Sequence, residues 1–347
     1  MLKLKLFLYR IFSTYIGRCI LRLFSFGVNV NLGREKKEKK FPFIVAITTD
    51  TESGYVDKDE RRVWQKENPN AFIGYYHGIR NLMGVFEKHK IKTTFFLSTQ
   101  CFSSKGEEYK KISKELGNLI KNGHEMGLHL HPDSDFALQE KLGRKFSATS
   151  AFFYDYGEKL EMIKAAKEII KENLGKECEK KIVSFRWGNW ALDSDGAKAL
   201  NESGFKIDSS AVPGIRGHIN DTMKYDWSSV NRHYPWKLST ANYLATNNSN
   251  SNITEIPIAT FSFFCLELRA DPVNSVLLNK AFIEYYKKAN RSEKPFVFMV
   301  ITHSPEATMK DGKPTKALKD LEQFIIFSKK FKDVKFFTLK EAYNSIS

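Results

Sequence analysis

The stretch GHEMGLHLHPD, residues 123–133, gathers three of the chain's eight histidines and two carboxylates within eleven residues. Its part HEMGLHL, 124–130, is a candidate strand. His129 and His131 then point to the same side, because residues two apart in an extended chain share a face. His124 follows Gly123 at the opposite end of this strand, so we assign it a structural role. The stretch predicts a polar site at the end of a strand and raises the question of which other residues reach it.

On both sides of this stretch, short β-branched or aromatic runs alternate with helical patterns. Candidate strands are 43–49, 92–99, 124–130, 181–187, 205–210, 254–259, 296–303 and 334–339. Candidate helices are 72–89, 106–121, 155–174, 193–203, 277–289 and 315–331. Strand-then-helix repetition favours a parallel sheet, and six or more such units favour an α/β barrel of the TIM type, complete or incomplete. The segment 211–253 breaks the rhythm and is a loop by composition.

The composition is that of a globular protein. The chain has 347 residues, 42% of them hydrophobic and 28 of them Phe, which is enough for a sizeable core. Four well-separated cysteines, with no CxxC pair, are typical of thiols in a reducing compartment. Residues 1–40 contribute +8 of the net charge of +15. Since no base-stacking or groove-reading motif accompanies this charge, we do not expect nucleic acid as a partner.

The N-terminal segment is basic and amphipathic. In MLKLKLFLYRIFSTYIGRCILRLFSFG, residues 1–27, a basic face opposes a bulky apolar face on a helical projection. Charges interrupt it too often for a spanning helix, and no cleavage site follows. This pattern suits a helix lying in the surface of an anionic membrane. The alternative is an amphipathic helix that packs on the body of the protein or on a second subunit. An uncleaved signal anchor is a third and weaker alternative. We expect residues 1–40 to form this segment and a linker, and residues 41–347 one barrel domain.

Polar side chains gather where the candidate strands end. In barrels and open α/β sheets this carboxyl edge carries the reactive groups. The groups at five strand ends are Asp50 and Glu52, His129 and His131, Arg186, Asp208, and His303. A single carboxylate there is ordinary, and Asp-Thr-Glu-Ser-Gly on its own is good turn chemistry. Five strand ends that each deliver a polar group predict a functional site.

The spacing of these residues suits a metal ion. Asp50 and Glu52 share a face of an extended chain, as do His129 and His131. Two close carboxylates repel each other unless a cation intervenes or one is protonated. Two imidazoles and the Glu52 carboxylate would leave room for water and substrate on one divalent ion. Zinc is our first expectation, and cobalt, iron or manganese would also accept such ligands.

In this order, the motifs resemble the polysaccharide deacetylases, carbohydrate esterase family four. They are AITTDTE, KTTFFLST, NGHEMGLHLHP, FRWGNW and VITHSP, and the resemblance covers residues 43–340. It implies a distorted, partly open (β/α) barrel of six to eight strands, a divalent metal, and hydrolysis of an N-acetyl group on a sugar. Branches of the family that this chain resembles are associated with lipopolysaccharide synthesis.

The resemblance also implies roles for the first two motifs, each with a departure. Asp50 matches the catalytic base, but Thr51 stands where the family commonly has its metal-binding Asp, and Glu52 looks like the replacement ligand. His129 matches the first ligand histidine. The family's second histidine lies four residues further, where this chain has Asp133. The third ligand is therefore His131, as the HxH spacing suggests, or Asp133.

The remaining motifs supply the other expected catalytic groups. Arg186 matches the arginine that orients the base and keeps it ionised, and the backbone N–H near Asn189 would supply the oxyanion donor. Trp187 and Trp190 stand in the same motif, which lacks the family's usual prolines. His303 matches the general acid. We expect Asp208 to be the carboxylate that supports it, with Asp226 as second choice.

These expectations point to an acetylated sugar or a lipid-linked glycan as substrate. Tryptophans near the third motif could stack on sugar rings or pack as loop hydrophobics. The basic segment and the absence of an export signal suggest a cytoplasmic protein at the inner face of the membrane, in surface-polysaccharide or lipopolysaccharide biosynthesis. Two other classes stay open, a non-catalytic glycan-binding protein on the same barrel and an amidohydrolase acting on a small cyclic amide.

Overall fold

The computed structural model describes residues 41–64, 67–68, 71–220, 223–247, 250–263 and 266–346. The segment 1–40, with the amphipathic helix and linker expected there, lies outside these ranges. Within them, no helix is both long enough and apolar enough to cross a membrane. The assignment of residues 41–347 to a single domain stays a prediction.

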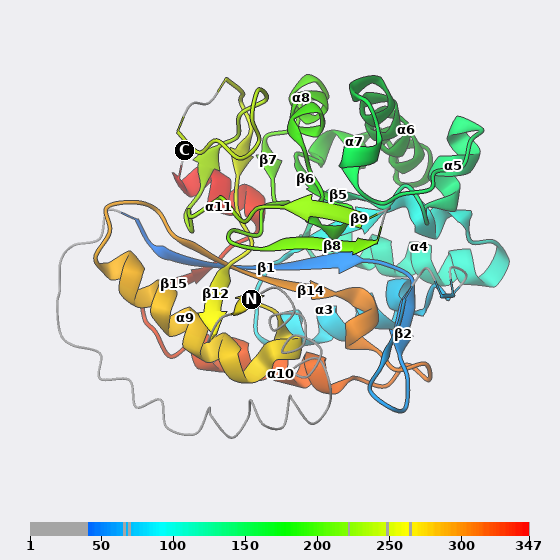
Figure 1. Ribbon diagram of the computed structural model, residues 1–347. Helices are drawn as coiled ribbons and strands as arrows, with labels where there is room; N and C mark the ends of the chain where they lie inside the picture. Colours follow the sequence, from blue (N-terminus) through cyan, green and yellow to red (C-terminus); the bar gives the residue numbers. More distant parts are fainter. Residues whose placement is uncertain are drawn as a thin grey trace.

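A curved sheet forms the centre of the molecule (Figure 1). Its strands are β1 (Phe43–Thr51), β4 (Thr94–Ser98), β5 (Glu125–Leu130), β6 (Ser184–Trp187), β7 (Ile207–Asp208), β10 (Trp236–Lys237), β11 (Thr254–Glu255), β14 (Val297–His303) and β15 (Val334–Phe336). The order is β10-β11-β7-β6-β5-β4-β1-β14, with β15 also beside β1. Every pairing is parallel except that of β10 with β11. The predicted parallel α/β sheet is confirmed.

The two sides of this sheet are joined by irregular chain, which makes the barrel partly open. The Ile258 N–H donates to the Ala211 carbonyl beyond β7 at 2.9 Å, and the next N–H, of Ala259, donates to the Met299 carbonyl of β14 at 3.1 Å. The Ala259 carbonyl in turn accepts a hydrogen bond of 2.8 Å from the Ala270 N–H. Backbone hydrogen bonds therefore bridge the gap where no regular strand ladder runs.

Helices pack around the sheet (Figure 1). They are α3 (Ile79–Lys88), α4 (Gly106–Lys121), α5 (Phe136–Leu142), α6 (Tyr156–Leu174), α7 (Lys176–Lys181), α8 (Ser194–Glu202), α9 (Ser275–Asn290), α10 (Lys316–Ser328) and α11 (Leu339–Ile346). The short helical turns are η1 (Gly74–Gly78), η2 (Thr99–Ser103), η3 (Ala151–Phe153), η4 (Gly188–Trp190), η5 (Pro272–Asn274) and η6 (Ser304–Ala307). Their starts follow local chemistry: Asp155 caps α6 and forms a capping box with Glu158. All six predicted helices are present.

Three two-stranded hairpins complete the fold. They are β2 (Gly54–Val56) with β3 (Arg62–Trp64), β8 (Arg216–Asn220) with β9 (Met223–Asp226), and β12 (Thr260–Phe263) with β13 (Leu266–Arg269). The prediction that 211–253 is a loop is wrong in part, because β8, β9 and β10 lie within it. Short antiparallel strands of mixed composition carry little period-2 signal, so the sequence pattern did not reveal them.

The core lies on both faces of the central strands. All nine residues of β1 are buried, as expected for a parallel strand covered on each side. Glycine is required where elements come closest: a Cβ on Gly127 of β5 would lie 2.6 Å from the Ser184 Oγ of β6. This close packing fixes the relative register of the strands, and with it the positions of the side chains at their carboxyl ends.

Candidate active site

The register of the parallel strands brings the predicted polar groups together. Asp50 at the end of β1 lies beside His303 at the end of β14. On β5, His129 lies beside Arg186 of β6. All four side chains are buried. The carboxyl edge of the sheet therefore holds one compact cluster of acidic and basic groups.

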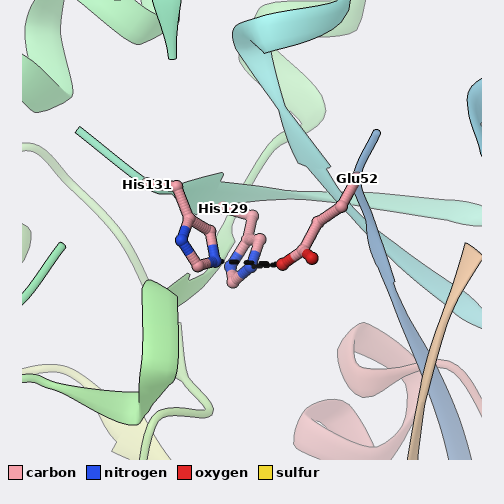
Figure 2. Close-up of side chains that lie close together, drawn as sticks. All are labelled: Glu52, His129 and His131. Atoms are coloured by element: carbon pink, nitrogen blue, oxygen red, sulfur yellow. Dashed lines mark hydrogen bonds and ion pairs between the residues drawn. The ribbon is translucent and has the colours of Figure 1, made fainter. Parts of the chain in front are cut away.

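Three side chains converge on one point (Figure 2). The Nε2 atoms of His129 and His131 lie 3.1 and 2.9 Å from the same oxygen, Oε1 of Glu52. Each residue offers one ligand atom, and these atoms lie within 4.8 Å of one another. Glu52 follows the last residue of β1, and His129 and His131 lie at the end of β5, so two strands with β4 between them supply the whole set.

The donor chemistry fits a divalent metal ion. The Nδ1 of His129 lies 2.9 Å from the Arg186 carbonyl oxygen, which can only accept, so Nδ1 carries the proton and Nε2 keeps its lone pair for a metal. Burial raises the pKa of Glu52, but when the two imidazoles are protonated the charge of His131 and hydrogen bonds from both rings outweigh it and lower that pKa well below its usual range. A divalent ion in place of those protons would favour the same ionised carboxylate. Two imidazoles and one ionised carboxylate match a catalytic zinc-type site with open positions.

Gly188 explains how His131 fits into this site. A Cβ at Gly188 would lie 2.4 Å from the Leu130 carbonyl oxygen and 2.9 Å from ring atoms of His131. The glycine after Trp187 in the third motif therefore lets η4 approach the end of β5 that carries His131. A larger residue there would displace the imidazole.

Asp133, the alternative third ligand, does not join this set. Its Oδ1 accepts a hydrogen bond from the Thr149 Oγ1 at 2.5 Å, and the side chain is only partly buried. His131 instead lies with Glu52 and His129. The structure thus favours the HxH spacing over the four-residue spacing, because His131 shares a face of the extended chain with His129.

Arg186 holds Asp50 from inside the barrel. Its Nη1 lies 2.6 Å from the Asp50 Oδ1. Its Nε donates to the Ser209 carbonyl at 2.9 Å, and its Nη2 donates to the Thr48 and Ser209 hydroxyls at 3.0 and 2.8 Å. The side chain is fully buried over the Phe96 ring. A positive charge with these partners fixes the orientation of the Asp50 carboxylate.

His303 lies on the other side of Asp50. Its Nε2 is 3.8 Å from the Asp50 Oδ2, and its Nδ1 is 3.3 Å from the Oε2 of Glu306. Glu306 also accepts the His303 backbone N–H at 3.1 Å and forms an ion pair with Arg62. Burial lowers the pKa of His303 and outweighs the carboxylates of Glu52 and Asp50, which raise it. A lowered pKa makes the protonated ring a stronger acid.

Asp208 is not the carboxylate beside His303, so that assignment is wrong. Its oxygens accept hydrogen bonds from the Ser210 hydroxyl and N–H at 2.9 and 3.2 Å. Ser209, the next residue, contacts Arg186 inside the barrel. Because neighbouring residues of a strand point to opposite faces, Asp208 points to the other face of the sheet. There it lies in register with Glu255 of β11. The second choice, Asp226, accepts hydrogen bonds from Ser228 instead.

Sequence reasoning missed Glu306 and Arg62, the pair behind His303. Glu306 follows His303 by three residues in the turn η6, a spacing that could have indicated a local contact. Arg62 belongs to the β2–β3 hairpin, which carried no recognised signal. Its guanidinium also covers the ring of Trp64, whose centroid lies 5.6 Å from that of His303.

The third motif contributes packing and a tight turn. Trp187 is fully buried and donates from Nε1 to the Thr149 carbonyl at 2.8 Å, which matches the packing alternative for this tryptophan and not stacking on a sugar. Trp190 is partly exposed. Asn189 between them has φ 51° and ψ 27°, the left-handed region that asparagine tolerates better than most residues. This turn directs the backbone after β6 across the carboxyl edge of the sheet.

Comparisons with known proteins agree on the fold. No protein-family model matches the sequence, and no curated protein does. Among solved structures, a candidate polysaccharide deacetylase from Mycobacterium smegmatis is similar at 14% identity and a TM-score of 0.55, covering 90% of this chain and 92% of that one. A probable polysaccharide deacetylase from Pseudomonas aeruginosa PAO1 is similar at 12% identity and a TM-score of 0.54, covering 88% of this chain and 91% of that one. The Puue allantoinase is similar at 13% identity and a TM-score of 0.56, covering 91% of this chain and 95% of that one. The chain therefore has the fold of the polysaccharide deacetylases, as the sequence motifs predicted.

Proposed function

We propose that this protein is a metal-dependent hydrolase that removes the N-acetyl group from a sugar. The observation that carries the proposal is the buried set of Glu52, His129 and His131. Asp50 and His303 lie within 4 Å of each other at its side. An acid, a base and a metal-binding set in one place are the parts that amide hydrolysis needs.

In this proposal the chain's own residues move the protons. Asp50, oriented by Arg186, accepts a proton from the water that attacks the acetyl carbon. His303 in its protonated form donates a proton to the amide nitrogen, so that the C–N bond breaks to give acetate and a free amine. Bound by Glu52, His129 and His131, a divalent ion would polarise the carbonyl and make the water more acidic. A backbone N–H near Asn189 would stabilise the oxyanion.

A panel of substrates tests this function. Purified protein reconstituted with zinc is incubated with N-acetylated mono- and oligosaccharides and, in parallel, with allantoin and other small amides. Acetate release from the sugars, lost in Glu52→Gln, is the expected result. Turnover of the small amides alone would support the second candidate, an amidohydrolase, which the fold likeness to the allantoinase favours. Sugar binding with no turnover of either class would support a glycan-binding protein.

The biological setting belongs to the proposal as well. A lipid-linked sugar of surface-polysaccharide or lipopolysaccharide assembly would suit an enzyme that lies on the inner face of a membrane. The basic apolar sequence of residues 1–27 supports this address. Sedimentation with anionic vesicles, lost on deleting residues 1–27, is expected; equal binding of both forms would contradict it.

A further inference from the structure

The hairpin β12–β13 ends at the rim of the candidate active site. Arg269 is the last residue of β13, and the next residue, Ala270, accepts a hydrogen bond of 3.0 Å from the Ile301 N–H of β14. Ile301 lies two residues before His303. Asp271 follows, and its charge raises the pKa of His303 against the stronger effect of burial. The backbone of Arg269 is therefore fixed beside the strand that carries the proposed general acid.

The side chain of Arg269 reaches from there to the opposite wall. Its Cζ lies 3.9 Å from the centroid of the Trp190 ring, in the turn that follows β6. Trp190 is itself held in place: its carbonyl accepts from the Trp227 Nε1 at 2.8 Å, and its ring meets Tyr225 edge to face at 5.6 Å. Arg269 thus lies on a rigid aromatic support between the strands of Arg186 and His303.

The guanidinium of Arg269 lacks partners. Its Nε is buried without a hydrogen-bond acceptor, and its Nη2 lies 3.8 Å from the Asp271 Oδ2, beyond hydrogen-bonding distance. No hydrogen bond from this guanidinium to another described residue is present, although the side chain is only 14% exposed. Arg186, by contrast, donates from all three of its nitrogens. A largely buried group with unused donors calls for a partner that the chain does not supply.

Arg62, a third arginine near the site, does not have unused donors of this kind. Arg62 pairs with Glu306 and covers Trp64, so its charge is already engaged. The planar guanidinium of Arg269 suits an oxyanion that accepts two parallel hydrogen bonds, as phosphate and carboxylate do. The weak ion pair with Asp271 leaves those donors available.

We propose that Arg269, supported by Trp190, binds an anionic group of the substrate. Resting on the proposed function, this inference makes the substrate an acetylated sugar that carries a phosphate or a carboxylate. The anion lies at the rim while the acetamido group lies against Asp50 and His303. Arg269 is then a specificity residue with no part in the proton transfers.

The test compares charged and neutral sugars. Acetate release is measured for N-acetylglucosamine 1-phosphate, N-acetylmuramic acid and N-acetylglucosamine with the wild type, Arg269→Gln and Arg269→Lys. For the favoured anionic sugar, kcat/KM should fall about ten- to hundredfold in Arg269→Gln, and less in Arg269→Lys. The rate with N-acetylglucosamine should change little. The phosphate and the carboxylate sources are distinguished by which of the two sugars shows the loss.

Arg291→Gln is the matched control, because it makes the same charge change at an exposed position after α9. An equal loss on charged and neutral sugars in Arg269→Gln, or the same loss in Arg291→Gln, would overturn the proposal. Unchanged melting temperatures exclude a folding defect; if Arg269→Gln fails to fold, the wild type and Arg269→Lys carry the comparison.

Calorimetry separates this inference from the proposed function. If the wild type releases acetate from none of the sugars, the proposed function fails, and binding of N-acetylglucosamine 1-phosphate and N-acetylmuramic acid is measured directly. Binding of either sugar that weakens at least tenfold in Arg269→Gln, but not in Arg291→Gln, still supports the anion site. Equal binding by wild type and Arg269→Gln, or no binding of either sugar, overturns it.

Discussion

The strand ends of β1, β5, β6 and β14 and the hairpins β8–β9 and β12–β13 lie near the same site but are built differently. The first group lies on regular parallel strands, and its register alone brings Asp50 to His303 and His129 to Arg186. The second group consists of two antiparallel hairpins that stand outside the central sheet. The reactive groups lie in the first, and Arg269 in the second. In the two proposals above, the parallel strands carry the chemistry and the hairpin β12–β13 the choice of substrate.

The largest effect is expected from the two proton-transfer residues. Asp50→Asn and His303→Ala should each lower kcat by about 10²–10⁴-fold, because each removes a group that takes or gives a proton in the transition state. Metal content should stay at the wild-type level, since neither residue belongs to the Glu52 set. Acetate release is the measurement, and a near-normal rate in either variant with metal bound would refute its role.

Loss of Arg186 should mainly lower stability. Arg186→Met leaves the buried Asp50 carboxylate without its cation and several acceptors without a donor. The free energy of unfolding should fall by about 3–5 kcal/mol. Urea unfolding monitored by circular dichroism measures this change, with the exposed Arg291→Met as control. A loss below about 1 kcal/mol would mean that Asp50 is neutral or paired elsewhere.

His124, just before the amino end of β5, should make the stability of the protein depend on pH. At the amino end, burial lowers the pKa of His124 from 6.5 to about 4, and its Nε2 has no partner. The unfolded chain therefore binds a proton that the folded chain resists, and stability should be lost as pH falls from 6.5 to 4, by about 3 kcal/mol. In His124→Gln the slope of stability against pH should be smaller in this window. An unchanged slope would show that His124 is accessible to protons when folded.

The smallest change in kcat is expected from the two carboxylates considered as partners of His303, Glu306 and Asp208. Glu306→Gln should lower kcat about tenfold with little change in KM, because the Glu306 carboxylate lies 3.3 Å from the Nδ1 of the His303 ring and accepts the His303 backbone N–H. Asp208→Asn should leave kcat within about twofold, as Asp208 lies on the other face of β7. Partial recovery in Glu306→Asp would support a positioning role. A larger loss in Asp208→Asn would restore the original assignment.

The sequence predicted the strands of the site well and its surroundings poorly. Asp50, Glu52, His129, His131 and His303 could be grouped because parallel strands end at one edge and residues two apart share a face. Asp208 was misplaced by the same rule, since a difference of one residue turns a side chain away from the barrel. The partners of His303 could not be found in advance. Glu306 depends on a short turn, and Arg62 on a hairpin of three-residue strands that has no clear pattern.

Metal content of the purified protein tests the central claim most directly. Wild type, His129→Ala, His131→Ala and Asp133→Ala are analysed side by side after reconstitution with zinc. About one ion per chain, lost in both histidine variants and kept in Asp133→Ala, is the predicted result. Loss in Asp133→Ala with retention in His131→Ala would contradict the ligand set, and a wild type that binds no ion would contradict the hydrolase itself.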